Sequence, residues 1–258
     1  MNPGWKSLFP WYVLSSQSTA FSPTGISGLA LWLDASDSST ITLDGSNNVS
    51  QWNDKSGNGR NATQATTLKR PSYPSSSWNG LNAVVFDGVD DNLSTAAFTF
   101  GNYTIFGVVS RPWSVNQYRG WFGHGYAGTS GKGTVQAQDN VASSFNAGET
   151  CYFGDGFNAG RTPRAFGAKP AVSDNIPVCF AARIGGSTTA RVNGIANTRI
   201  ADNGTSTTAS NAFVVGSTGE STDRWNGRVC ELVLYSRELT DAEIVSVENY
   251  LRAKWGTS

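Results

Sequence analysis

The sequence predicts an all-β fold in which two antiparallel sheets pack face to face. From Ile26 onward, short apolar runs alternate with clusters of Gly, Asn, Asp and Ser. This alternation is typical of short strands joined by tight turns. The chain has 258 residues, a length that suits one large β domain. No low-complexity linker divides it, so we expect one body over 26–258, preceded by an extended arm over 1–25.

Several apolar runs are predicted to be strands of this body. They cover residues 28–36, 81–88, 102–110, 212–216 and 228–236. Residues 190–197 are predicted to form a hairpin, because Asn193-Gly194 is the preferred pair for a type I′ turn. Asp54 and Asp87 each stand where a strand enters a Gly-rich turn, so we expect both carboxylates to accept backbone hydrogen bonds there.

The C-terminal segment predicts one helix. Thr240 is a good N-cap, Glu243 completes a capping box with it, and Leu239 before the cap provides a hydrophobic staple. Gly256 suits the position after the last turn. The apolar residues recur on one face: Ile244, Val247, Leu251 and Trp255. We expect this face to pack on the sandwich.

The charge composition argues against nucleic-acid and membrane partners. Nineteen basic residues balance nineteen acidic ones, and only 15% of residues are charged. Polyanionic partners call for a basic excess. The three cysteines, Cys151, Cys179 and Cys230, are too few for a disulfide framework. We expect buried free thiols, and a Cys179–Cys230 bridge stays open as an alternative.

The first 25 residues combine aromatic side chains with Pro3, Pro10 and Pro23. Proline at this density opposes both helix and central strand. We therefore expect an extended arm whose aromatics anchor it to a partner: Trp5, Phe9, Trp11 and Tyr12. The N-terminus does not have the pattern of a secretory signal. An adhesive protein without an export signal can still reach the outside of the cell. Virion proteins do so, because they are synthesised in the host cytosol and released by lysis.

Five segments together resemble one family, the LamG-like jelly-roll domains (laminin G or concanavalin A-like) of phage virion and bacterial surface proteins. The segments are LALWLDASDSSTIT (29–42), VSQWNDKSGNGRNATQ (49–64), RPSY (70–73), NGLNAVVFDGVDDNLS (79–94) and ELVLYSRELTDAEIVSVENYLRAKWG (231–256). The resemblance implies a two-sheet jelly-roll sandwich, which often binds carbohydrate or protein. It does not identify the function by itself.

The residues that catalysis would need are scarce, so we predict that the protein is not an enzyme. A glycosidase of this fold needs paired carboxylates in one cleft. The six glutamates show no such pairing: Glu149, Glu220, Glu231, Glu238, Glu243 and Glu248. His124 is the only histidine and has no nucleophile motif around it, which disfavours a triad or a zinc site.

No cofactor is predicted, although calcium stays open as an alternative. Asp87, Asp90, Asp91 and Asn92 are close in sequence and offer the oxygen ligands that Ca²⁺ prefers. Relatives in the superfamily that the chain resembles often bind calcium. The spacing is too short for an EF-hand loop, and a turn explains the same segment.

The Gly-rich region over 111–166 is predicted to display the binding surface, because long loops on a rigid sandwich carry many binding sites. Its candidate ligand-binding residues are Trp113, Tyr118, Trp121, His124, Tyr126 and Asp155. Packing in the core or against a neighbouring subunit is an equal alternative for these aromatics. The sequence thus predicts a non-catalytic virion surface protein, either a capsid decoration protein or a tail- or head-attached adhesin. We expect the arm to bind capsid or tail proteins, the body to bind glycans, and the protein to be oligomeric or lattice-bound. A free carbohydrate-binding lectin-like module is the alternative.

Overall fold

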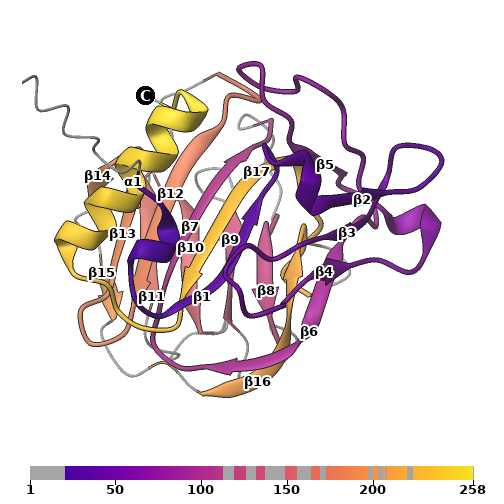
Figure 1. Ribbon diagram of the computed structural model, residues 1–258. Coiled ribbons are helices and arrows are strands. Elements are labelled where there is room, and N and C mark those ends of the chain that lie inside the picture. Colours follow the sequence, from indigo (N-terminus) through magenta and orange to yellow (C-terminus); the bar gives the residue numbers. More distant parts are fainter. Residues whose placement is uncertain are drawn as a thin grey trace, which may run out of the picture.

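The computed structural model describes residues 21–112, 119–125, 132–136, 149–155, 164–168, 173–196, 200–202, 206, 208–219 and 223–257. In these residues the chain forms two antiparallel sheets, packed as a sandwich, with a single α-helix on the outside (Figure 1). The predicted fold class is therefore confirmed for the sheets and the helix. Most of the predicted arm, including its four anchoring aromatics, lies outside the described residues.

The first sheet has seven strands in the order β1-β17-β7-β12-β13-β14, with β5 paired to β17. These strands are β1 (Leu29–Asp34), β5 (Val84–Asp87), β7 (Tyr103–Ser110), β12 (Val178–Ile184), β13 (Thr189–Val192), β14 (Ile195–Ala196) and β17 (Asn226–Tyr235). Each strand predicted over 28–36, 81–88, 102–110 and 228–236 belongs to this sheet. The predicted hairpin is β13 and β14, and its turn residues Asn193 and Gly194 have φ angles of 48° and 81°.

The second sheet has ten strands in the order β15-β11-β10-β9-β8-β16-β6-β4-β3-β2. These are β2 (Ile41–Leu43), β3 (Val49–Trp52), β4 (Ala62–Thr63), β6 (Leu93–Phe100), β8 (Phe122–His124), β9 (Lys132–Gln136), β10 (Glu149–Asp155), β11 (Arg164–Ala168), β15 (Ile200–Asp202) and β16 (Ala209–Val215). The predicted strand over 212–216 is the end of β16.

The main core lies between the two sheets and is rich in aromatic side chains. Trp52, Trp121, Trp225, Phe122 and Phe153 are all fully buried within it. Large aromatic side chains bury much apolar area each, so they dominate the stabilising hydrophobic term of a sandwich.

A second core lies on the other face of the first sheet, under the helix α1 (Asp241–Trp255). All eight residues of β7 are buried, because β7 is covered on both faces. The predicted apolar face of the helix is confirmed: Ile244, Val247, Leu251 and Trp255 are each at most 1% exposed. Figure 1 shows α1 lying along this side of the sandwich.

The ends of α1 also agree with the sequence. Thr240 Oγ1 accepts a hydrogen bond from the Glu243 backbone N–H, and Glu243 Oε2 accepts one from the Thr240 N–H at 2.8 Å. Gly256 closes the helix with φ of 65°. Leu239 and Ile244 are both buried in the core under the helix, as expected for a hydrophobic staple.

Replacing Thr240 with alanine should lower the free energy of unfolding by about 1 kcal/mol, because one backbone donor of the first helical turn loses its acceptor. Urea denaturation measures the change. Ser246→Ala on the same helix is the control, since Ser246 is exposed and bonds only to the Ala242 carbonyl. An equal loss in both variants would mean that the cap contributes nothing specific.

Two turn carboxylates behave as the sequence predicted. Asp54 accepts hydrogen bonds from the backbone N–H groups of Trp32, Ser56 and Arg60, at 3.0, 2.8 and 3.0 Å. Asp87 Oδ1 accepts one from the Val89 N–H at 2.8 Å. Asp54 therefore ties its own turn to β1 and helps to hold this part of the sandwich together.

Cys179 and Cys230 are free, buried thiols, so the expectation of unpaired thiols is confirmed for these two residues. Cys179 lies on β12 and Cys230 on β17, with β7 between the two strands. Two strand spacings separate them, about 9–10 Å, which exceeds the Cα separation of a disulfide. Burial raises the pKa of both thiols.

The last residues of the predicted arm belong to the body. The Tyr235 hydroxyl donates to the Pro23 carbonyl at 2.9 Å, and Pro23 is buried. The ring of Phe21 lies 5.6 Å from that of Tyr250 on α1. Phe21 and Pro23, which the sequence assigns to the arm, therefore contact the body.

Candidate functional site

The predicted display surface divides between the core and residues that the structure does not describe. Trp113, Tyr118 and Tyr126 lie outside the described residues, and Asp155 is described only as the last residue of β10. Trp121 and His124 are described, and both are fully buried. Both side chains therefore lie in the core of this structure rather than at its surface.

A glycine on the facing sheet explains the burial of Trp121. A Cβ atom added to Gly107 on β7 would lie 2.6 Å from Cη2 of Trp121, so the indole occupies the space that this glycine leaves. Trp121 also lies 6.1 Å, ring to ring, from Phe153. Its contacts join the two sheets and make it a core residue.

His124 is buried because β8 lies inside the second sheet, between β16 and β9. Its Nε2 lies 2.9 Å from the Phe98 carbonyl oxygen, and its ring is 4.3 Å from that of Phe100. The neighbouring glycines had suggested an exposed loop, but Gly123 is needed because a Cβ there would collide with the Thr218 carbonyl.

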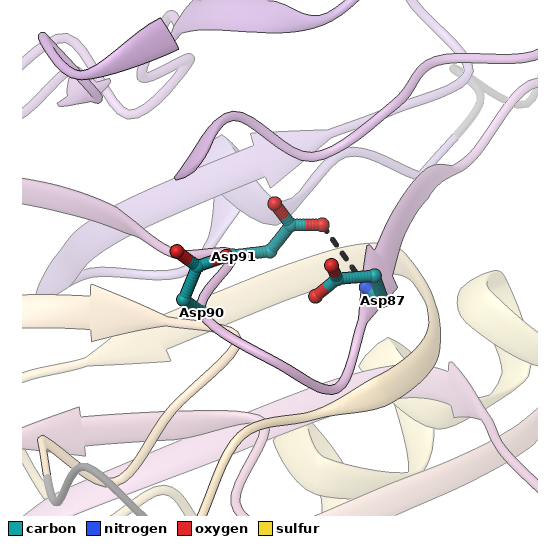
Figure 2. Close-up of side chains that lie close together, drawn as sticks. All are labelled: Asp87, Asp90 and Asp91. Carbon is teal, nitrogen blue, oxygen red and sulfur yellow. Dashed lines mark hydrogen bonds between the residues drawn. The ribbon is translucent and has the colours of Figure 1, made fainter. Parts of the chain in front are cut away.

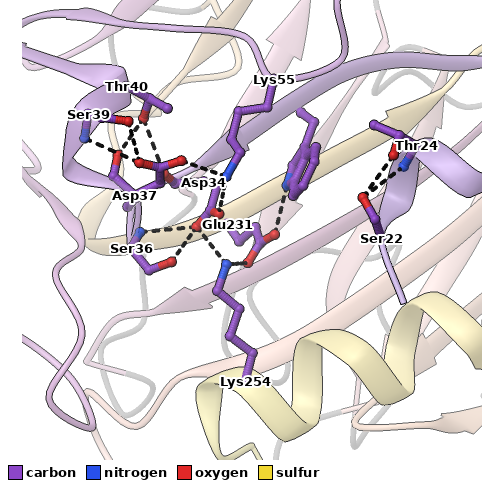
Figure 3. Close-up of polar contacts among 12 residues, drawn as sticks. Ser22, Thr24, Asp34, Ser36, Asp37, Ser39, Thr40, Lys55, Glu231 and Lys254 are labelled. Atoms are coloured by element: carbon purple, nitrogen blue, oxygen red, sulfur yellow. Dashed lines mark hydrogen bonds and ion pairs between the residues drawn. The ribbon is translucent and has the colours of Figure 1, made fainter. Parts of the chain in front are cut away.

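A dense polar cluster lies between β1, β17 and α1 (Figure 3). Asp34 on β1 stands directly opposite Glu231 on β17. Lys254 of α1 bridges the two carboxylates, with its Nζ 2.6 Å from Asp34 and 2.7 Å from Glu231. Lys55 pairs with the other oxygen of Asp34 at 2.9 Å and with Asp37 at 2.8 Å.

Glu231 accepts four hydrogen bonds in this cluster. The indole N–H groups of Trp32 and Trp255 each donate at 2.7 Å, and the Tyr250 hydroxyl donates at 2.9 Å. Together with Lys254 these donors use both carboxylate oxygens. Glu231 is 0% exposed, so its carboxylate has protein donors on both oxygens and no contact with solvent.

The pKa values of the paired carboxylates, Glu231 and Asp34, shift in opposite directions. Burial and the neighbouring Asp34 charge raise the pKa of Glu231, against the attraction of Lys254. Burial also acts to raise the pKa of Asp34, but Lys254, Ser36 and Lys55 outweigh it and hold that pKa below its ordinary value. Such divergence accompanies acid–base catalysis in accessible sites. Here no substrate can reach Glu231, so the pair stabilises the contact between helix and sheet.

Three further glutamates, Glu238, Glu243 and Glu248, are also engaged by protein groups. Glu238 accepts from Asn102, Gly186 and Ser187 at 2.8, 3.0 and 2.7 Å. Arg237 lowers the pKa of Glu243 to about 2, and Glu243 belongs to the helix cap. Glu248 pairs with Arg191 at 2.8 Å and is 1% exposed.

A second acidic group lies in the turn that joins β5 to β6 (Figure 2). One carboxylate oxygen from each of Asp87, Asp90 and Asp91 lies within 4.8 Å of the other two. Asp91 Oδ2 accepts from the Asp87 N–H at 3.0 Å. Burial, followed by the charges of Asp87 and Asp90, raises the pKa of Asp91 to about 6. Three carboxylates are compatible with Ca²⁺ but supply only part of its six to eight ligands.

Replacing Asp91 with asparagine should stabilise the protein at neutral pH by on the order of 1 kcal/mol, after allowance for solvent screening. The folded state binds the Asp91 proton more tightly than the unfolded chain does. The free energy of unfolding therefore falls as pH rises from 3.8, the ordinary aspartate value, to about 6. Urea denaturation at about pH 4.5 and about pH 7.5 should show this fall in the wild type and a flatter profile in Asp91→Asn.

The same pair of proteins tests calcium. If the turn binds Ca²⁺, calcium chloride raises the melting temperature of the wild type at neutral pH but not that of Asp91→Asn. Equal pH profiles for the two proteins would contradict the buried environment of this carboxylate.

Two open grooves lie on the described surface. The first, which we call the serine groove, has a volume of about 500 Å³ and is lined by Ser46, Asn47, Ser72, Tyr73, Pro74 and Ser75. The second, the helix groove, has a volume of about 360 Å³ and lies beside α1. Its arginines are paired: Arg183 with Asp241 at 2.7 Å, and Arg191 with Glu248 at 2.8 Å.

No described helix has the length and apolarity to span a membrane.

The chain matches no protein-family model and no curated protein. Solved structures with the same fold do match it. The binding domain of Paraclostridial Mosquitocidal Protein 1 has a TM-score of 0.61 at 12% identity, over 92% of this chain and 56% of that one. Domain 4 of AbnA, a GH43 extracellular arabinanase from Geobacillus stearothermophilus solved with arabinotriose, has a TM-score of 0.57 at 13% identity, over 85% of this chain and 98% of that domain.

A Trypanosoma rangeli sialidase, solved with sialic acid, has a TM-score of 0.56 at 13% identity. The match covers 90% of this chain but only 34% of the sialidase, so the chain spans about a third of that enzyme. At these identities the comparisons establish the fold. The protein is a β-sandwich similar in fold to the binding domain of the mosquitocidal protein and to domain 4 of the arabinanase.

Proposed function

We propose that the protein is a non-catalytic β-sandwich module that binds glycans. The observation that carries the proposal is the match to domain 4 of the arabinanase, which was solved with arabinotriose. This chain covers 98% of that domain, so the likeness extends over a whole module. The engaged carboxylates of Asp34, Glu231, Glu238 and Glu243 support the absence of catalysis in the described part of the chain.

A glycan array and a hydrolase panel test this function on the purified full chain. We expect binding to at least one glycan class and no turnover of polysaccharides, esters or peptides. Hydrolysis that disappears when one carboxylate is replaced would contradict the non-catalytic role. A chain that binds nothing on the array would contradict glycan binding.

A second proposal concerns where the module works: on the surface of a phage virion, held to capsid or tail proteins by residues 1–20. The contacts of Phe21 with Tyr250 and of Pro23 with Tyr235 favour it, because they tie the start of the body to the face that carries α1. A LamG-like module of this kind would be displayed as a lattice-bound copy or an oligomer.

Deleting residues 1–20 tests the virion role while keeping the contacts of Phe21 and Pro23. The shortened protein should keep its melting temperature and its glycan binding but lose attachment to virions of the phage that encodes it. Alanine at Trp5 and Trp11 should weaken attachment in the same way. Full occupancy of particles by the shortened protein would show that residues 1–20 are not the anchor.

A further inference from the structure

The serine groove lies between two chain segments that are tied together by backbone hydrogen bonds. One wall is the turn between β2 and β3, which carries Ser46 and Asn47. The other is the segment 72–75. The Asn47 carbonyl accepts from the Tyr73 N–H at 3.2 Å, and Asn48 forms an antiparallel bridge with Ser72. Backbone hydrogen bonds of the sandwich therefore hold the two walls of the groove together.

Both walls are held in place from behind. Asp44 Oδ1 accepts from the backbone N–H groups of Ser46 and Asn48, at 2.9 and 3.0 Å, and its other oxygen pairs with Arg70 at 3.1 Å. The Tyr73 hydroxyl donates to the buried Ala35 carbonyl at 2.6 Å. A site preorganised in this way loses less conformational entropy when a ligand binds.

Three polar side chains that line the groove are free to bind a ligand. The hydroxyls of Ser46 and Ser75 and the side-chain amide of Asn47 make no hydrogen bond to any described residue, and all three residues are exposed. An amide offers two donors and an acceptor, and a hydroxyl offers both functions. Such groups complement sugar hydroxyls, which also donate and accept. Pro74 adds an apolar surface for the C–H face of a sugar ring.

The lining carries no charge. Ser46, Asn47, Ser72, Tyr73, Pro74 and Ser75 are all neutral residues, and the nearby Arg70 is neutralised by Asp44. An anionic sugar would find no free cation here to offset the loss of its hydration. The volume of about 500 Å³ lies within the usual range for small-ligand sites, about 300–1,000 Å³.

We propose that the serine groove is the glycan-binding site and that its ligand is a neutral oligosaccharide, recognised through Ser46, Asn47 and Ser75. This rests on the proposed function, that the protein binds glycans. It adds the place of binding and the class of sugar. Sialylated, sulfated and uronic-acid glycans are expected to bind more weakly than neutral ones.

Asn47 offers a clean substitution, because its φ of 62° suits glycine. The test variant is Asn47→Gly with Ser75→Ala, which removes two recognition groups without straining the backbone. Asn79→Gly is the matched control, since Asn79 is also exposed, has φ of 48° and does not line the groove. Calorimetry measures binding of neutral trisaccharides, including arabinotriose, and of sialyllactose as the anionic probe.

We expect the wild type and Asn79→Gly to bind a neutral trisaccharide with equal affinity, and the groove variant to bind it about tenfold or more weakly at an unchanged melting temperature. NMR shift changes on titration should centre on residues 44–48 and 72–76, which tests the site without any variant. Unchanged affinity in the groove variant, or shifts elsewhere, would overturn the groove while leaving glycan binding intact. Tighter binding of sialyllactose than of the neutral trisaccharides would overturn the proposal that the ligand is neutral. Absence of binding by the wild type to every glycan would overturn the proposed function itself.

Discussion

Replacing Glu231 with alanine is expected to lower the free energy of unfolding by about 3–5 kcal/mol, the usual cost of removing one partner of a buried ion pair. The loss leaves the indole N–H groups of Trp32 and Trp255 without their acceptor. Lys254 keeps Asp34 but loses its second carboxylate. Because these groups are buried, water cannot replace Glu231 without opening the contact between α1 and the sheet.

Asp37→Ala is the matched control for this experiment. Asp37 belongs to the same ionic cluster through Lys55, but its side chain is 34% exposed. Exposed ion pairs contribute little, so the control should cost only about 0–1 kcal/mol. Urea denaturation of both variants gives the comparison. Equal, small losses would show that Glu231 is accessible to solvent, and would reopen the paired carboxylates as a chemical site.

The cluster around Glu231 draws its residues from three segments that lie far apart in the sequence. Asp34 comes from 29–42, Lys55 from 49–64, and both Glu231 and Lys254 from 231–256. Segments far apart in the sequence thus supply one ionic contact that joins sheet to helix. These residues specify the scaffold, so their presence says little about the ligand that such a scaffold carries.

Local signals were enough to predict α1 and the central strands. The capping box, the staple and the closing glycine of α1 depend on residues within a few positions of one another. The turn at Asn193-Gly194 likewise depends on the conformations of two adjacent residues. The β6 strand was not predicted, because its sequence LSTAAFTF mixes small and polar residues and its burial alternates irregularly along the strand.

The features that the sequence did not reveal depend on contacts between distant residues. Glu231 has no acidic neighbour along its own strand, yet Asp34 stands opposite it on β1. Trp121 looked like a residue for display until Gly107, on the other sheet, was seen to make room for it. A glycine inside the apolar run 103–110 is the one local sign that a large side chain from elsewhere would pack there.

Replacing Leu251 with alanine is expected to lower the free energy of unfolding by about 2–5 kcal/mol, because a fully buried side chain on α1 is shortened and a cavity remains. Leu251 belongs to the core under the helix, together with Phe106 on β7 and the thiols of Cys179 and Cys230. Those thiols provide a local probe of the same contact. If the shortened side chain loosens α1, both thiols should react faster with an alkylating reagent under native conditions, since only transient opening exposes them.

Val245→Ala is the control, because Val245 lies on the same helix but is 41% exposed. It should change the free energy of unfolding by no more than about 0.5 kcal/mol and leave thiol reactivity unchanged. Urea denaturation separates global stability from the local opening that alkylation reports. A Leu251→Ala protein with wild-type stability and slow alkylation would show that α1 does not cover the sheet. The outer face of β7, β12 and β17 would then be a large apolar surface in need of another partner.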